Sequence, residues 1–123
     1  MGYHVIDPAD LSIAPNRPSA MRSISDAANL DTLGLRIYDV APGEDVPLRG
    51  LHYHEEQEEA FYVVTGSVSA ETPDGTFSVG AGEFFVVHPR NPHRLFNDDS
   101  SESAARIVGI GAPSGTDSHS VER

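Results

Sequence analysis

The chain has 123 residues, which is enough for one compact domain but not for two separate cores. Its formal net charge of -11 comes from 19 acidic side chains against 8 basic ones, and none of the basic residues is a lysine. Such a surface repels phosphate groups, so neither nucleic acids nor anionic membranes are expected as partners. Because the chain has no cysteine, disulfides, thiolate metal sites and cysteine nucleophiles are excluded.

The sequence also bears on location. No apolar run approaches the roughly 20 residues needed to span a bilayer, and the first residues lack the basic and apolar regions of a secretion signal. We therefore expect a cytoplasmic protein with no membrane contact. The acidic balance is typical of a halophile-like surface, and an ordinary acidic protein is the alternative interpretation.

The chain divides into three predicted segments. Residues 1–30 contain prolines that interrupt any regular pattern, so we expect an N-terminal arm with one short strand at 3–6 and irregular backbone after it. Residues 31–112 alternate between short apolar runs and turn residues, which is typical of one domain. Residues 113–123 are small and polar without a period, which predicts a flexible C-terminal tail.

Short strands are expected throughout the central segment. Apolar and other residues alternate with a period of two over 33–40, which indicates a strand. Pro73, Asp74 and Gly75 predict a tight turn, because proline presets φ and glycine accepts a positive φ. Strands at this spacing favour an all-β sandwich or barrel. The other expected strands cover residues 51–54, 60–66, 67–72, 76–80, 83–88, 93–97 and 105–111.

Three histidines and one glutamate stand where strand pairing would bring them together. His52 and His54 are two residues apart in an expected strand, so both imidazoles point to one face. Glu59 begins the next strand, and antiparallel pairing would return it beside them. His93 begins a later strand. This set of side chains suits one divalent transition metal ion, namely Mn, Fe, Co, Ni, Cu or Zn.

Each of these residues also has a purely structural interpretation. A lone histidine in a strand is usually a surface residue or a core residue with satisfied hydrogen bonds. The nearby Glu55, Glu56 and Glu58 are consistent with a solvated acidic loop. The longer pattern in which the four residues stand favours the metal site.

That pattern resembles the cupin family. The first cupin motif, Gly-x5-His-x-His-x3,4-Glu-x6-Gly, is similar to the stretch HYHEEQEEAFYVVTG, in which His52, His54, Glu59 and Gly66 have the motif spacing. The preceding glycine departs from the motif, because Gly43 is separated from the first histidine by eight residues instead of five. The difference suggests an inserted loop between them.

The second cupin motif, Gly-x5-Pro-x-Gly-x2-His-x3-Asn, is similar to the stretch GEFFVVHPRNPHRLFN. Gly82, His93 and Asn97 stand at the motif positions. The chain departs from the motif where His88 replaces the proline and Arg90 replaces the second glycine. Arg90 would then need a left-handed backbone, which costs a non-glycine residue about 1 kcal/mol or more.

The resemblance covers residues 34–111. It implies a double-stranded β-helix (cupin, or jelly-roll) barrel, with a metal ion held inside one end by the two motifs and with coordination positions left open. It also implies that Gly66 serves a tight turn and that Asn97 is structural. Cupins are commonly homodimers, so we expect a homodimer whose other partner is a small-molecule ligand.

Three functions follow from such a site. A divalent ion with three neutral imidazoles and one carboxylate has a net charge of about +1, which favours a small anionic ligand. The protein could be a mononuclear metalloenzyme, such as a dioxygenase, isomerase or decarboxylase, or a non-catalytic binding or sensor module, or a barrel with a structural metal. No catalytic residue is assigned. The candidates for acid-base work or for a carboxylate clamp are Tyr38, Tyr53, His88, Arg36, Arg90 and Arg94.

Overall fold

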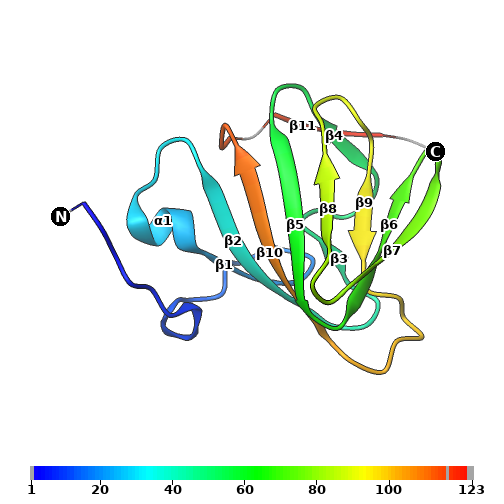
Figure 1. The fold of residues 1–123 in the computed structure, drawn as a ribbon, viewed down its shortest axis with the longest axis horizontal. Helices are drawn as coiled ribbons and strands as arrows, with labels where there is room; N and C mark the ends of the chain where they lie inside the picture. The colour runs from blue at the N-terminus through cyan, green and yellow to red at the C-terminus, as the bar shows by residue number, and fades with distance from the viewer. Residues whose placement is uncertain (1, 116, 122–123) are drawn as a thin grey trace.

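The structure is a computed structural model that describes residues 2–115 and 117–121. Short strands make up most of its regular elements (Figure 1). No helix among these residues has the length and apolar character to cross a membrane. The elements in chain order are the 3-10 helix η1 (Pro8–Asp10), β1 (Ala20–Ser23), the helix α1 (Ile24–Ala28), β2 (Gly34–Val40), β3 (Asp45–Val46), β4 (His52–His54), β5 (Glu58–Thr65), β6 (Ser67–Thr72), β7 (Gly75–Gly80), β8 (Phe84–Val87), β9 (Arg94–Phe96), β10 (Ala105–Ala112) and β11 (Ser118–Ser120).

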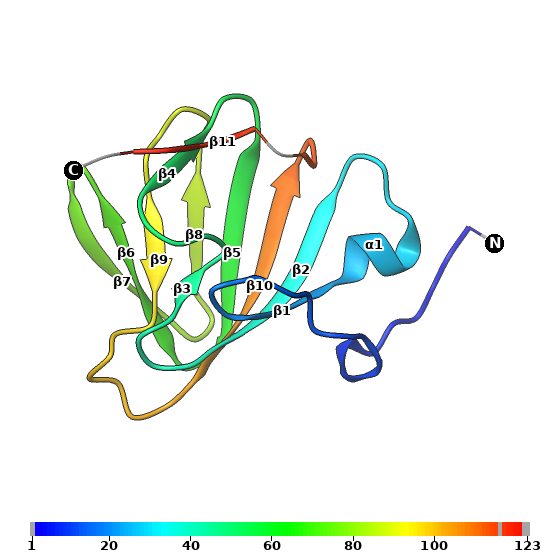
Figure 2. The same ribbon diagram turned by 180° about the vertical axis from the view of Figure 1, so that it is seen from behind.

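Two antiparallel sheets face each other and form the barrel (Figures 1 and 2). The larger sheet has the strand order β1-β2-β10-β5-β8, and the smaller has the order β3-β9-β6-β7. β4 pairs with β11, and both views show this pair at the end of the barrel toward which β8 and β10 run. The arrangement is the all-β double-stranded β-helix that the sequence predicts.

Apolar side chains from alternate strand positions fill the space between the sheets, as the two-residue period of a strand requires. β10 shows the pattern along its whole length, since every second residue from Ala105 to Gly111 is buried. The buried apolar residues are Met21, Tyr38, Val40, Val46, Phe61, Val63, Val68, Ala70, Val79, Val87, Leu95, Ala105 and Ile107.

The inner face of β2 is less apolar than its outer face. Gly34, Tyr38 and Val40 are buried, and Arg36 shares their side of the strand, whereas Leu35 lies on the opposite side. The Tyr38 ring packs closely on β10, because a Cβ added at Gly109 would lie only 2.8 Å from the ring. An arginine and a tyrosine therefore face the barrel interior.

The predicted strands from 51 to 111 are confirmed within about two residues at each end. The prediction of a strand at 3–6 is wrong. This stretch has no strand partner, and Tyr3 and Val5 are 81% and 105% exposed. The arm pairs instead through β1, which lies antiparallel to β2 at the edge of the larger sheet. Part of the predicted arm thus belongs to the sheet.

The C-terminal segment also differs from the flexible tail expected over 113–123. β11 pairs with β4 over its three residues, and the Val121 N–H donates to the Leu51 carbonyl at 2.9 Å. These backbone hydrogen bonds fix a stretch whose side chains carry no apolar period. Residues 116, 122 and 123 of the expected tail lie outside the described residues.

Asn97 has the structural role that the resemblance implies. Its side chain is 1% exposed, and its amide donates to the carbonyls of Val40 and Ser103, each at 2.9 Å. The side chain thereby ties the end of β2 to the connection that leads into β10. Burying a polar group is tolerated here because its donors are satisfied.

Gly66 provides a test of the turn between β5 and β6. It has a φ of +76°, and an added Cβ would lie 2.9 Å from the Ala104 carbonyl oxygen. Gly82 has a φ of +85° with open space around it. We expect Gly66→Ala to lower the free energy of unfolding by about 3 kcal/mol, since conformational strain adds to a backbone clash. Gly82→Ala should cost about 1 kcal/mol from strain alone. Equal losses in urea unfolding would contradict this account.

Candidate metal centre

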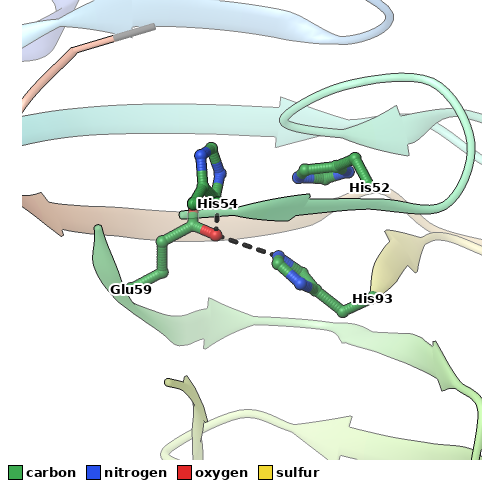
Figure 3. A group of neighbouring side chains, drawn as sticks. All are labelled: His52, His54, Glu59 and His93. Atoms are coloured by element: carbon green, nitrogen blue, oxygen red, sulfur yellow. Dashed lines mark hydrogen bonds and ion pairs between the residues drawn. The ribbon is translucent and has the colours of Figure 1, made fainter. Parts of the chain in front are cut away.

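Four buried side chains meet at one end of the barrel (Figure 3). His52 and His54 lie on β4, Glu59 lies near the start of β5, and His93 directly precedes β9. Each is between 1% and 8% exposed. One ligand atom from each residue lies within 4.8 Å of the others. The structure therefore brings together all four residues that the sequence predicts for the metal site.

The backbone holds β4 and the start of β9 in register. The His52 N–H donates to the His93 carbonyl at 3.0 Å, and the His93 N–H donates back to the His52 carbonyl at 2.8 Å. The Arg90 N–H donates to the His54 carbonyl. Arg90 has a φ of +66°, as its place at a motif glycine predicts, and this conformation turns the chain back toward β4.

Each imidazole is oriented by an acceptor at Nδ1. Nδ1 lies 3.3 Å from the Gly50 carbonyl oxygen in His52 and 2.9 Å from the Asn91 carbonyl oxygen in His93. In His54 it lies 2.9 Å from Oδ1 of Asp117. Since these acceptors require a proton on Nδ1, each neutral ring leaves a lone pair on Nε2.

Two of the three Nε2 atoms, those of His54 and His93, meet at the Glu59 carboxylate. Oε1 of Glu59 lies 2.9 Å from Nε2 of His93 and 3.1 Å from Nε2 of His54, and Figure 3 shows it between the two rings. The contact with His54 is at ion-pair distance but lacks hydrogen-bond alignment. Lone pairs that converge on a carboxylate oxygen need a positive charge among them, either a proton on a ring or a metal ion.

The burial and charge of the cluster shift its acid-base equilibria. Burial raises the pKa of Glu59, but the contacts with His54 and His93 lower it by a larger amount. The net result is a pKa of about 2, so the carboxylate is ionised. The same carboxylate raises the pKa of His54, against the opposite effect of burial. Burial, followed by the proximity of His93, lowers the pKa of His52 and favours its neutral ring.

The arrangement fits a metal ion. Nε2 of His52 and Nε2 of His54 are buried without a hydrogen-bond partner among the described residues. Unsatisfied buried acceptors cost free energy, and a cation between them would satisfy both. Three imidazole nitrogens and one carboxylate oxygen are ligands that Mn, Fe, Co, Ni, Cu and Zn accept.

Residues of the cluster line several cavities, of which two contain a histidine of the cluster. One of ≈ 120 Å³ is lined in part by His54, Glu59 and Arg36. Another of ≈ 400 Å³ is lined in part by His93 and His88. A small molecule could therefore approach the cluster, which a purely structural metal site would not need.

The other candidates from the sequence are placed differently. Tyr38 is 2% exposed and lines a small cavity that Glu59 and Arg36 also line. Burial raises the pKa of the Tyr38 hydroxyl, so this group keeps its proton at neutral pH. His88 is exposed at the rim of the larger cavity. The Arg90 guanidinium donates to the Glu55 carbonyl at 3.3 Å.

Two further candidates, Tyr53 and Arg94, make their contacts away from the cluster. Tyr53 stacks on His119 with ring centroids 5.0 Å apart, because it alternates with the two histidines of β4 and faces away from them. Arg94 makes two hydrogen bonds to Asp45 and packs over the Phe96 ring. Neither residue lines a cavity that reaches the cluster.

The sequence did not point to Asp117 or Gln57. Asp117 lies 63 residues from His54 and immediately before β11, in a stretch whose composition favours disorder. Its second oxygen accepts the Glu56 N–H at 2.8 Å, so one carboxylate bridges the loop after β4 and a ring of the cluster. Gln57 lines the cavity beside Glu59. The position of Asp117 follows from the pairing of β11 with β4, and that of Gln57 from its hydrogen bond to the Pro113 carbonyl.

A family model described as a cupin domain matches residues 36–110. The match covers more than half of the chain. The chain belongs to the cupin family. The two cupin motifs thus account for the four residues of the cluster and for Asn97 and Gly66. Among curated proteins, no match to this cupin was found.

Solved structures share the fold at low sequence identity. The polyketide cyclase RemF from Streptomyces resistomycificus has a TM-score of 0.81 and 20% identity over 98% of this cupin and 87% of that chain. A sugar phosphate isomerase from Silicibacter pomeroyi has a TM-score of 0.79 and 21% identity over 98% and 83%. A predicted oxalate decarboxylase from Thermotoga maritima has a TM-score of 0.73 and 16% identity over 90% and 100%. These similarities show the fold and not the reaction.

The role of Asp117 in orienting His54 can be tested by substitution. Asp117→Ala should lower the affinity for a divalent metal by about 10- to 100-fold, because His54 loses the acceptor that fixes its tautomer and orientation. Asp10→Ala, on an exposed 3-10 turn, is the matched control and should leave the affinity unchanged. Competition with a metal-binding dye would measure both. Equal affinities for the two variants would show that Asp117 does not orient the ring.

Proposed function

We propose that this cupin uses His52, His54, Glu59 and His93 to hold one divalent transition metal ion and that it binds or transforms a small anionic metabolite there. The observation that carries the proposal is the pair of buried Nε2 atoms without a hydrogen-bond partner in the described chain, on rings already oriented through Nδ1. When bound, the ion would supply Lewis-acid or redox chemistry.

The charge of the loaded site favours an anion. Three neutral imidazoles and an ionised Glu59 leave a divalent ion with a net charge of about +1. The remainder of the protein is strongly acidic, so the site would be a local region of positive potential. The cavity of ≈ 120 Å³ beside His54 limits the ligand to a small molecule.

Catalysis of the isomerase, decarboxylase or dioxygenase type is the first candidate activity. The structural neighbours named as a cyclase, an isomerase and a predicted decarboxylase support it at the level of fold. Tyr38 is the candidate proton donor, because its hydroxyl is protonated and lines a cavity that Glu59 also lines. His88 is the candidate at the larger cavity. Arg90 has a weaker claim, since its guanidinium contacts the Glu55 carbonyl.

A binding or sensor role without turnover is the second candidate. The same cluster and cavities would serve it, because binding needs the site but not a reacting group. The cytoplasmic location and the halophile-like character inferred from the composition stay predictions.

The metal site has a direct test. Protein purified without a histidine tag and incubated with Mn, Fe, Co, Ni, Cu or Zn should carry near-stoichiometric metal by plasma mass spectrometry. The double variant His52→Ala/His93→Ala should carry almost none, because two of four ligands are lost. His4→Ala, at an exposed histidine, should load like the wild type. A wild type that takes up none of these metals would refute the proposal.

We also propose a homodimer. Val64, Phe84 and Val86 are 41%, 60% and 62% exposed on the outer face of the paired strands β5 and β8, and Tyr62 packs on Phe84 with ring centroids 4.6 Å apart. β8 is also the last strand of the larger sheet, and its outer edge pairs with no other strand of the described residues. A second copy of the chain would cover this apolar face.

Phe84→Lys tests the dimer. The wild type should have the mass of a dimer by light scattering, and Phe84→Lys should shift it toward the monomer, since a charge would be buried at the contact. Phe77→Lys, at a residue that is 51% exposed on the other sheet, should leave the dimer intact. A monomeric wild type would exclude the assembly.

A further inference from the structure

Arg36 faces the barrel interior, and its guanidinium forms no ion pair with a carboxylate of the residues that the structure describes. It lies on the inner face of β2, and its strand neighbour on β10 is Gly109, which has no side chain to cover it. Its Nε is buried without a hydrogen-bond partner among the described residues. The residue as a whole is half-buried, and a guanidinium that is partly removed from water is stabilised by a paired anion, because desolvation of an unpaired charge is costly.

Other arginines of the same sheets are paired. Arg22 and Arg106 both bind Asp39, and Arg94 binds Asp45. These ion pairs lie on strand faces or edges where water reaches them. Arg36 differs because it faces inward and forms no ion pair with the residues that the structure describes.

The space in front of Arg36 leads to the candidate metal centre. Arg36 lines the cavity of ≈ 120 Å³ together with Arg17, Gln57, His54 and Glu59. It also lines the small adjoining cavity with Tyr38, whose hydroxyl lies within hydrogen-bonding reach of the guanidinium and is its neutral partner there. Two guanidinium groups thus share one cavity with two of the four residues that would hold the ion.

Among the described residues, Glu59 forms no ion pair with Arg17 or Arg36. It is the one carboxylate among the described residues that line the cavity of ≈ 120 Å³. Its Oε1 is in contact with His54 and His93. The cavity wall therefore has two guanidinium charges whose natural partner is a planar oxyanion, because the arginine fork binds a carboxylate through two parallel hydrogen bonds.

We propose that Arg36, assisted by Arg17, binds the carboxylate group of a small molecule whose other end reaches the His52, His54, Glu59 and His93 cluster. This inference rests on the proposed function and narrows its anionic metabolite to a carboxylate. Arg36 determines which ligands are accepted, whereas the cluster holds the ion. Gln57, with an amide that donates to the Pro113 carbonyl, forms a neutral side of the same cavity.

The experiment compares malonate with malonamide, which has a similar shape without the charge. Both are titrated calorimetrically at constant ionic strength into metal-loaded and metal-free protein. Malonate should bind the wild type, and Arg36→Gln should weaken its binding at least tenfold with an unchanged metal content. Arg36→Lys should give an intermediate loss, since it keeps the charge but not the fork. Arg106→Gln, at a residue that pairs with Asp39 outside the cavity, should bind malonate like the wild type.

Several results would overturn the assignment. These are wild-type affinity for malonate in Arg36→Gln, malonamide binding as tight as malonate binding, or tighter binding of inorganic phosphate than of malonate. The metal measurement separates this inference from the proposed function. If the wild type takes up no metal but metal-free protein binds malonate through Arg36, the metal site fails and the carboxylate site stands. If metal loads normally and malonate binding does not depend on Arg36, only the carboxylate site fails.

Discussion

Two backbone hydrogen bonds between His52 and His93 hold the candidate metal centre together. They join β4 to the residue that begins β9, across 41 positions of the chain, at 3.0 and 2.8 Å. Because side-chain direction follows strand register, a slip of one residue would turn either imidazole away from the interior. The positions of His54 and Glu59 follow from local geometry. His54 lies two residues after His52 on β4, and Glu59 returns beside them because only a short loop separates β4 from β5.

The polar cluster has consequences for the barrel around it. Burying three imidazoles and a carboxylate is unfavourable unless each group is satisfied, and each ring has an acceptor at Nδ1. Two of these acceptors are backbone carbonyls within two residues of the ring. The third, Asp117, comes from the C-terminal segment. The rings are thus held in position before any ion binds, which favours tight and selective coordination.

The sequence predicted the parts of this structure that depend on local period and motif spacing. The strands from 51 to 111, the left-handed backbone of Arg90 and the meeting of the four cluster residues all follow from such patterns. β2 shows where the pattern was insufficient. Leu35 and Ile37 resemble a core face by hydrophobicity, yet the face with Arg36 and Tyr38 points inward. The reason is that this end of the barrel encloses polar groups and a cavity, so hydrophobicity no longer identifies the inner side.

The sequence also did not predict which distant segments pair with each other. Nothing in the composition of 113–123 predicts that β11 would cover β4, since the strand gains its stability from backbone hydrogen bonds and from the Asp117 carboxylate instead of from apolar side chains. The strand predicted at 3–6 failed because strand formation also depends on a distant partner. These residues pair with no strand of the described chain, and the arm joins β2 through β1 instead.

The division between the shared fold and the peripheral segments suggests how specificity arises in this cupin. The four cluster residues lie within the segment 36–110 that matches the family, whereas Arg17 and Asp117 lie outside it. Arg17 reaches the cavity from the N-terminal arm and Asp117 reaches His54 from the C-terminal strand. The motifs of the barrel thus supply the four candidate ligands, whereas the two flanking segments supply the carboxylate beside His54 and a second guanidinium in the cavity. We therefore expect the choice of ligand to depend on the segments that close the barrel as well as on the barrel itself.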